Sequence, residues 1–264
     1  MKDSFVTLLY IFICSIYCIT YFYVKKTLSL QQENNIDMKK LLFTLLIIMA
    51  SVGAFAQSGV EKQHEVLFTT SMGDIRVVLY NETPKHRDNF LKLVKEGYYD
   101  GNLWHRVISN FMIQSGDSTS RHAPQGKLLG EYSPDYVIPA EILFPKYFHK
   151  RGALAAAREG DDVNPNYDSS ASQFYIVWGR RFNDDMLDAV EDRIDRATHG
   201  KVKLTPEVRE YYKIHGGTPH LDGQYTVFGE VIEGLDVVQK IQAVETDSNN
   251  RPVEDVKIIK AVAY

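Results

Sequence analysis

Cysteine is almost absent from this chain of 264 residues, which holds only two, at positions 14 and 18. Both lie in the first 56 residues, so residues 57–264 contain none and need no disulfides even in an oxidising compartment. Neither cysteine follows the small residue of a lipoprotein site, because Ile13 and Tyr17 precede them. Because residues 57–264 contain no cysteine, a scaffold held together by disulfides is excluded for this part of the chain.

An excess of positive charge is also missing. The chain has 30 Lys and Arg against 34 Asp and Glu, a net charge of −4. The first 56 residues hold five of the basic and three of the acidic residues, so the remainder carries about −6. Nucleic-acid binding depends on a basic patch, so we expect no nucleic-acid partner.

No metal-binding pattern is complete. Residues 162–168 alternate acidic and amide side chains as in a calcium loop. Tyr167, however, replaces the glycine that such a loop needs for its sharp turn, and Gln173 stands where the last ligand is a glutamate. A solvated loop is predicted here, and no metal site is assigned.

The N-terminal region contains two export patterns. Residues 5–24 form a 20-residue run without charge, long enough to span a bilayer as a helix. The second pattern starts at Met38, where two lysines precede an apolar core at 41–50 and the small-x-small end Ala54-Phe55-Ala56. This order predicts a signal peptide over 38–56, cleaved after Ala56.

Two export elements in one chain are redundant. We interpret residues 1–37 as an upstream extension of the reading frame, with Met38 as the true start. The alternative is that residues 5–24 are a retained membrane anchor. The first interpretation predicts a periplasmic or secreted protein made of residues 57–264, a length suited to one domain.

The pattern of elements after residue 57 is rich in short strands. A hairpin is predicted over 65–80, a helix from Thr83-Pro84 to Gly97, a second helix over 235–244 and a last strand over 256–262. Further short strands are predicted at 104–108, 111–115, 137–143, 152–157, 172–178 and 225–232. The expected fold is mostly β: a closed eight-stranded antiparallel barrel capped by two α-helices. A charged, helical block at 180–218 is predicted to be an insertion.

One stretch, WHRVISNFMIQSGD at 104–117, concentrates the chemistry of the chain. Together with SQFYI at 172–176, LDGQYTVFG at 221–229, the opening TTSMGDI and the Thr83-Pro84 helix, it resembles the cyclophilin family of peptidyl-prolyl cis-trans isomerases. The resemblance runs from about 65 to 262, interrupted by the block at 180–218. It implies a bacterial, exported rotamase that needs no metal or cofactor.

The resemblance also implies roles for individual residues. Arg106 is expected to donate to the prolyl nitrogen, and Gln114 to hold the substrate carbonyl and place the guanidinium. The expected substrate groove comprises Phe111, Met112, Leu221, Tyr175, Gln173, Ala157, Arg158, His220 and Tyr225. Four of these depart from frequent family residues: Tyr175 from phenylalanine, Arg158 from asparagine, His220 from tryptophan and Tyr225 from histidine.

His105 precedes the expected catalytic arginine directly. Neighbouring residues of a strand point to opposite faces, so His105 is expected to point away from Arg106. We predict a packed, hydrogen-bonded histidine and not a catalyst.

The expected partners are proline-containing peptides and unfolded exported proteins, bound by a monomer; a membrane is involved only if residues 5–24 are retained. A second hypothesis is a non-catalytic, cyclophilin-like chaperone or binding module. The insertion, lying between Tyr175 and His220 in sequence, either extends the substrate surface or only covers one end of the barrel.

Overall fold

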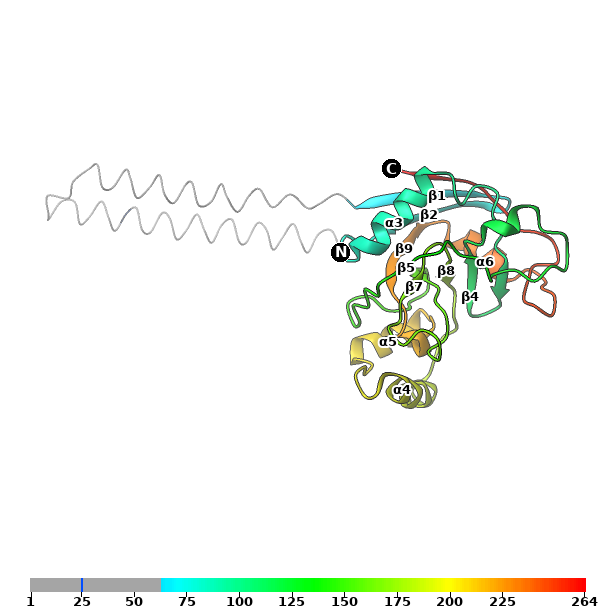
Figure 1. The fold of residues 1–264 in the computed structure, drawn as a ribbon. Helices are drawn as coiled ribbons and strands as arrows, with labels where there is room; N and C mark the ends of the chain where they lie inside the picture. The colour runs from blue at the N-terminus through cyan, green and yellow to red at the C-terminus, as the bar shows by residue number, and fades with distance from the viewer. Residues whose placement is uncertain (1–24, 26–62) are drawn as a thin grey trace, which may run out of the picture. The chain divides into compact units, whose positions relative to one another are not determined.

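The computed structural model describes residue 25 and residues 63–264 (Figure 1). The predicted membrane segment at 5–24, the signal peptide at 38–56 and residues 57–62 of the expected domain lie outside the described residues. In the part of the chain that is described, every helix is too short or too polar to cross a bilayer.

Strands alternate with short helices along residues 63–264. The elements, in chain order, are β1 (His64–Thr70), β2 (Gly73–Leu79), α3 (Pro84–Lys95), β3 (Arg106–Ile108), β4 (Met112–Ser115), η1 (Ser118–His122), β5 (Val137–Ile138), β6 (Ala153–Ala156), β7 (Ser169–Ser170), β8 (Phe174–Val177), α4 (Asp184–Thr198), α5 (Pro206–Ile214), η2 (Pro219–Leu221), β9 (Val227–Glu233), α6 (Leu235–Gln242) and β10 (Ile258–Ala263).

Eight of these strands form one curled antiparallel sheet in the order β10-β1-β2-β9-β6-β8-β4-β3 (Figure 1). The outer strands, β10 and β3, are not paired as a ladder; an isolated bridge between Leu103 and Lys257 joins the segments just before them. β5 and β7 make a separate two-stranded sheet. The mostly β, antiparallel fold is confirmed, and full closure of the barrel stays a prediction.

The first hairpin forms as its alternating pattern predicts. Ile75, Val77 and Leu79 are fully buried, and the register pairs Thr70 with Gly73 across the turn. The Thr70 hydroxyl donates to the Gly73 carbonyl at 2.6 Å, which closes the turn from within.

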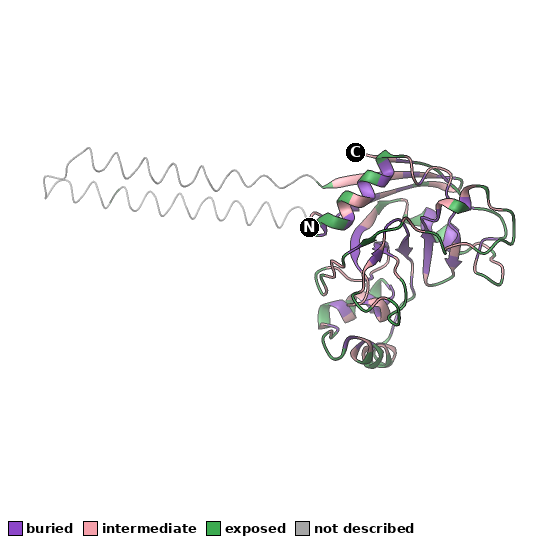
Figure 2. Cartoon of the chain, viewed as in Figure 1, coloured by how far each residue is buried: buried purple, intermediate pink, exposed green. Residues whose placement is uncertain are grey.

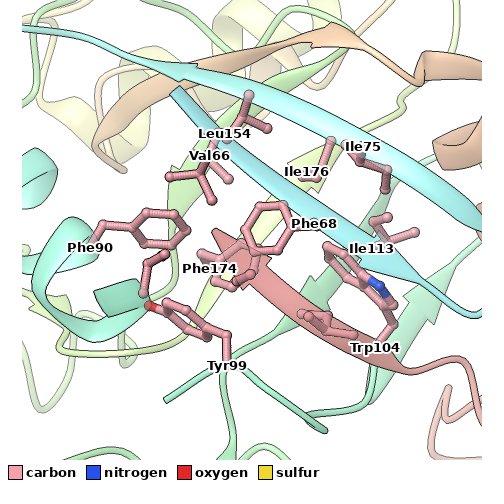
Figure 3. Close-up of a cluster of buried hydrophobic side chains, with 14 of the residues drawn as sticks. Val66, Phe68, Ile75, Phe90, Tyr99, Trp104, Ile113, Leu154, Phe174 and Ile176 are labelled. Atoms are coloured by element: carbon pink, nitrogen blue, oxygen red, sulfur yellow. The ribbon is translucent and has the colours of Figure 1, made fainter. Parts of the chain in front are cut away.

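Aromatic rings fill the space between the sheet and α3. Phe174 lies at the centre, stacked on Phe68 at 5.6 Å and edge-on to Phe90 at 5.2 Å and Trp104 at 5.7 Å (Figure 3). Phe90 belongs to α3, whose residues alternate between buried and exposed along the helix (Figure 2). Edge-to-face and offset pairs of this kind add to the stabilisation from burial alone.

The predicted helical block contains α4 and α5 (Figure 1). Asn183 caps α4 by accepting from the backbone of Met186 at 2.8 Å, and Thr205 caps α5 by accepting from Val208 at 3.3 Å. The two helices have a small core of their own, comprising Phe182, Leu187, Ile194, Leu204, Val208 and Tyr212. Side-chain caps and an apolar face explain why these polar segments are helical.

Candidate active site

The register of β3 and β4 brings together the two residues expected to be catalytic. Arg106 on β3 lies opposite Gln114 on β4, and Gln114 lies opposite Tyr175 on β8. The Arg106 Nη1 donates to the Gln114 Oε1 at 3.0 Å. Burial lowers the pKa of the Arg106 guanidinium, which has no acidic partner within ion-pair distance among the described residues.

Gln114 is itself held from behind. Its Nε2 donates to the Gln173 Oε1 at 2.9 Å, and the Gln173 Nε2 donates to the carbonyls of Gly130 and Tyr132 at 2.7 and 3.0 Å. Gly116 lets the backbone at Ser172 and Gln173 come close to the end of β4, because a Cβ at position 116 would lie 2.1 Å from the Ser172 carbonyl oxygen. The chain of amides fixes which end of Gln114 faces Arg106.

A pocket of about 190 Å³ opens beside this pair. Nine of the eleven expected site residues line it: Arg106, Phe111, Met112, Gln114, Ala157, Arg158, Tyr175, Leu221 and Tyr225. Met112 and Tyr175 are buried and form its apolar interior. The pocket is therefore a small recess with an apolar interior, and its wall carries two arginines, Arg106 and Arg158, and the amide of Gln114.

The other two expected residues lie next to this pocket and do not line it. Gln173 stands behind Gln114 and faces a broader hollow of about 840 Å³ together with Gln114, Ala157 and Arg158. His220 stacks on the Phe111 ring, with centroids 5.4 Å apart, and lines a neighbouring hollow. Contact of either with a bound peptide stays a prediction.

The Arg158 side chain is held in place at the edge of the pocket. The guanidinium lies 4.5 Å from the ring centres of both Tyr167 and Tyr225, and its Nε donates to the Gln224 carbonyl at 2.8 Å. An Arg between two aromatic faces braces the Tyr225 wall of the pocket.

A buried polar network lies behind Tyr175, and the sequence did not predict it. The Tyr175 hydroxyl and the His149 Nε2 are 2.9 Å apart, the His149 Nδ1 lies 2.8 Å from the Asp222 Oδ1, and the Tyr212 hydroxyl donates to the Asp222 Oδ2 at 2.7 Å. Because a carboxylate only accepts, His149 donates from Nδ1 to Asp222, and its Nε2 is hydrogen-bonded to the Tyr175 hydroxyl. A histidine and an aspartate 73 positions apart gave no local pattern that could have predicted this network.

His105 is packed as expected, with 2% of its surface exposed, but it is not hydrogen-bonded. Neither ring nitrogen has a hydrogen-bond partner among the described residues, so that part of the prediction is wrong. Strand alternation correctly predicted that the ring points into the interior, but it gives no information about hydrogen-bond partners there. Burial lowers the pKa of His105 to about 4.

Acid sensitivity follows from this burial. In the unfolded chain His105 takes up a proton near pH 6.5, whereas the folded protein resists protonation until about pH 4. The free energy of unfolding is therefore expected to be highest above pH 6.5, where His105 is neutral in both states. It is expected to fall as the pH drops towards 4, by roughly 3 kcal/mol for this residue. Urea unfolding at pH 7, 5.5 and 4.5 measures it.

The control for this pH dependence is the substitution His105→Leu. It removes one titrating group, so the slope of stability against pH between 6.5 and 4.5 is expected to decrease by close to one proton. An unchanged slope would contradict the assignment to His105. His220 and His86, whose pKa values burial also lowers, remain in this variant and keep part of the slope.

Metal ligands are not gathered anywhere in the described residues: no three His, Cys, Asp or Glu side chains are placed to share an ion. The chemistry available at the pocket is hydrogen-bond donation from a guanidinium into an apolar recess. Donation of this kind stabilises charge that develops on a bound group.

Residues 65–263 match the family model described as cyclophilin type peptidyl-prolyl cis-trans isomerase/CLD. The chain belongs to this family. The peptidyl-prolyl cis-trans isomerase ppi1 of Schizosaccharomyces pombe is 35% identical to this cyclophilin over 195 residues, covering 74% of this chain and 95% of the relative. Homology of this extent makes the protein a peptidyl-prolyl cis-trans isomerase.

Solved structures agree on the fold of this cyclophilin. The cyclophilin type isomerase cgd2_1660 of Cryptosporidium parvum has a TM-score of 0.54 at 24% identity, covering 77% of this chain and 98% of that one. A second structure of that protein, in the presence of the dipeptide Ala-Pro, has a TM-score of 0.52 at 22% identity. Cyclophilins bind proline-containing peptides, which defines the substrate class.

Proposed function

We propose that Arg106 accelerates rotation about X–Pro bonds by donating a hydrogen bond to the prolyl nitrogen. An amide resists rotation because its nitrogen shares a lone pair with the carbonyl, which gives a barrier of ~18–20 kcal/mol. In the twisted transition state this lone pair is localised on nitrogen. A donor aimed there binds the transition state more tightly than either ground state, as catalysis requires.

The observation that carries this proposal is the Arg106–Gln114 pair on the wall of the apolar pocket. An arginine stays charged and presents a planar fork of donors, so one N–H can bind Gln114 while others face the substrate. The apolar residues Phe111, Met112 and Leu221 would receive the proline ring and exclude water. Exclusion of water strengthens a hydrogen bond to the guanidinium.

The reaction itself supplies the test. Uncatalysed X–Pro exchange takes tens of seconds, so a protease-coupled assay on a short proline peptide resolves any acceleration. The purified protein is expected to accelerate the exchange, and the acceleration is expected to depend on Arg106. A protein that binds such peptides without any acceleration would support the binding-module hypothesis instead.

The proposed setting is the bacterial envelope or the secreted fraction, where this monomeric cyclophilin would act on exported, unfolded proteins. The support is the signal-peptide pattern over 38–56 and the lack of cysteine in residues 57–264. The mature protein is therefore expected to begin at Gln57. N-terminal sequencing of protein purified from the source cells checks this, and a start upstream of residue 24 would favour the membrane anchor.

A further inference from the structure

A hollow of about 600 Å³ lies beside the proline pocket, and α4 forms one of its walls. Phe111 lines both cavities, and His220, which stacks on Phe111, lines the larger one. Leu221, the next residue along, lines the proline pocket. The two cavities therefore meet at Phe111, so a peptide whose proline occupies the smaller cavity would have a neighbouring side chain close to the larger one.

The lining of this hollow is apolar inside and cationic at the rim. Phe182 is buried, and Met186 and Val190 are half-buried on the α4 side. Arg180 and Arg193 also line it; both are exposed, and among the described residues neither has an acidic side chain within ion-pair distance. The Arg180 guanidinium lies over the Phe182 ring, 5.4 Å from its centre. Two guanidinium groups without acidic partners beside an apolar surface suit an anionic side chain with an aliphatic stem.

Three of the acidic residues of α4 pair with basic residues of α5, and none of the acidic residues of α4 lines the hollow. Arg209 on α5 binds the carboxylates of Asp188 at 2.6 Å and Glu191 at 2.9 Å. Lys213 binds Asp184 at 3.2 Å. The basic residues of α5 thus partly neutralise the acidic residues of α4. Among the α4 residues that line the hollow, Arg193 is the only charged one.

We propose that this hollow is a substrate subsite that recognises an acidic residue, preferably glutamate, close to the proline of the bound peptide. The methylene groups of the glutamate would pack on Met186 and Val190, and its carboxylate would bind Arg180 and Arg193. This inference rests on the proposed function, because it assigns the helical block a part in binding the same peptide.

A peptide series tests the subsite directly. Each peptide contains one proline and carries Glu, Gln or Lys at a single position within four residues on either side. At one position kcat/KM is expected to be about fivefold higher for Glu than for Gln, the effect of two exposed charge pairs. In 1 M NaCl, where the screening length is ~3 Å, the ratio is expected to approach one.

The double variant Arg180→Glu/Arg193→Glu is expected to invert this preference, so that Lys is preferred to Glu at that position. The variant Arg180→Gln/Arg193→Gln should abolish it without adding charge. The matched control, Arg181→Glu/Arg196→Glu, changes the net charge equally at two exposed arginines that do not line the hollow. It is expected to keep the wild-type ratio of Glu to Gln.

Two results would overturn the subsite: no position with a preference for Glu in the wild type, or an equal loss of preference in the control variant. Either can occur while a peptide with alanine at every flanking position is still accelerated in an Arg106-dependent way. Failure of the wild type to accelerate that alanine peptide would instead refute the proposed function.

Discussion

Replacing Arg106 by alanine is expected to lower kcat on a short X–Pro peptide by about 10²–10³-fold. Loss of one donor that stabilises transition-state charge costs ~2.7–4 kcal/mol in other enzymes. Arg106 reaches the pocket from β3, and within residues 63–264 its side chain has one hydrogen-bond partner, Gln114, so the substitution removes the donor without unpairing a buried acid. The protease-coupled assay measures the effect.

The loss of activity in Arg106→Ala is expected to appear in kcat and not in KM. If Arg106 acts mainly in the transition state, kcat and kcat/KM fall together and KM changes little. Arg106→Lys retains the charge but not the planar fork, so it is expected to recover only part of the rate. A loss confined to KM would mean that Arg106 only binds the ground state.

Arg76 provides the control for Arg106. It is a half-buried arginine on β2 that pairs with Glu65 and Glu233 and does not line the proline pocket. Arg76→Ala is expected to leave kcat unchanged and to change the free energy of unfolding little, because ion pairs near the surface contribute little to stability. Equal losses of activity in Arg76→Ala and Arg106→Ala would refute the catalytic assignment.

Replacing Asp222 by alanine is expected to lower the free energy of unfolding by about 3–5 kcal/mol. Asp222 is fully buried and accepts hydrogen bonds from the His149 backbone, the His149 ring and the Tyr212 hydroxyl. Truncation leaves all three donors buried without a partner. Because a domain has a total stability of only ~5–15 kcal/mol, this is a large share.

Thermal unfolding measures the loss, which corresponds to a decrease in Tm of roughly 6–20 °C for a domain of this size. Asp222→Asn retains an acceptor and can donate to Tyr212, so a smaller decrease is expected. Asp236→Ala, at an exposed acid paired with Lys240, is the surface control and is expected to change Tm little. A decrease in Asp222→Ala no larger than in this control would contradict the role of the network.

Local patterns in the sequence predicted most elements of the fold. Alternation identified the faces of β2, and Thr83-Pro84 marked the start of α3. The Thr83 side chain, however, does not cap α3; its hydroxyl donates to the Tyr80 carbonyl at 3.3 Å. Residues 137–143 were predicted as a strand, but only Val137–Ile138 pair, with β7. A short strand depends on a distant partner, which periodicity does not encode.

The motifs also located the pocket, because the residues around Arg106 have a spacing tied to one chemistry. What they could not supply was the set of contacts made by each side chain. His149, Asp222 and Tyr212 meet only when the segment before β6, the end of η2 and α5 are packed together. The Arg158 guanidinium likewise lies between Tyr167 and Tyr225 only in the folded chain.

The sequence alone determined the family, the mostly β architecture and the residues around the proline pocket, since these depend on residue type, order and spacing along the chain. Only the tertiary structure decided that Gln173 holds Gln114, that His105 is buried without a hydrogen bond, and that α4 adds an arginine-lined hollow beside the pocket. These features arise from contacts between segments far apart in the chain, and such contacts exist only after the backbone has folded.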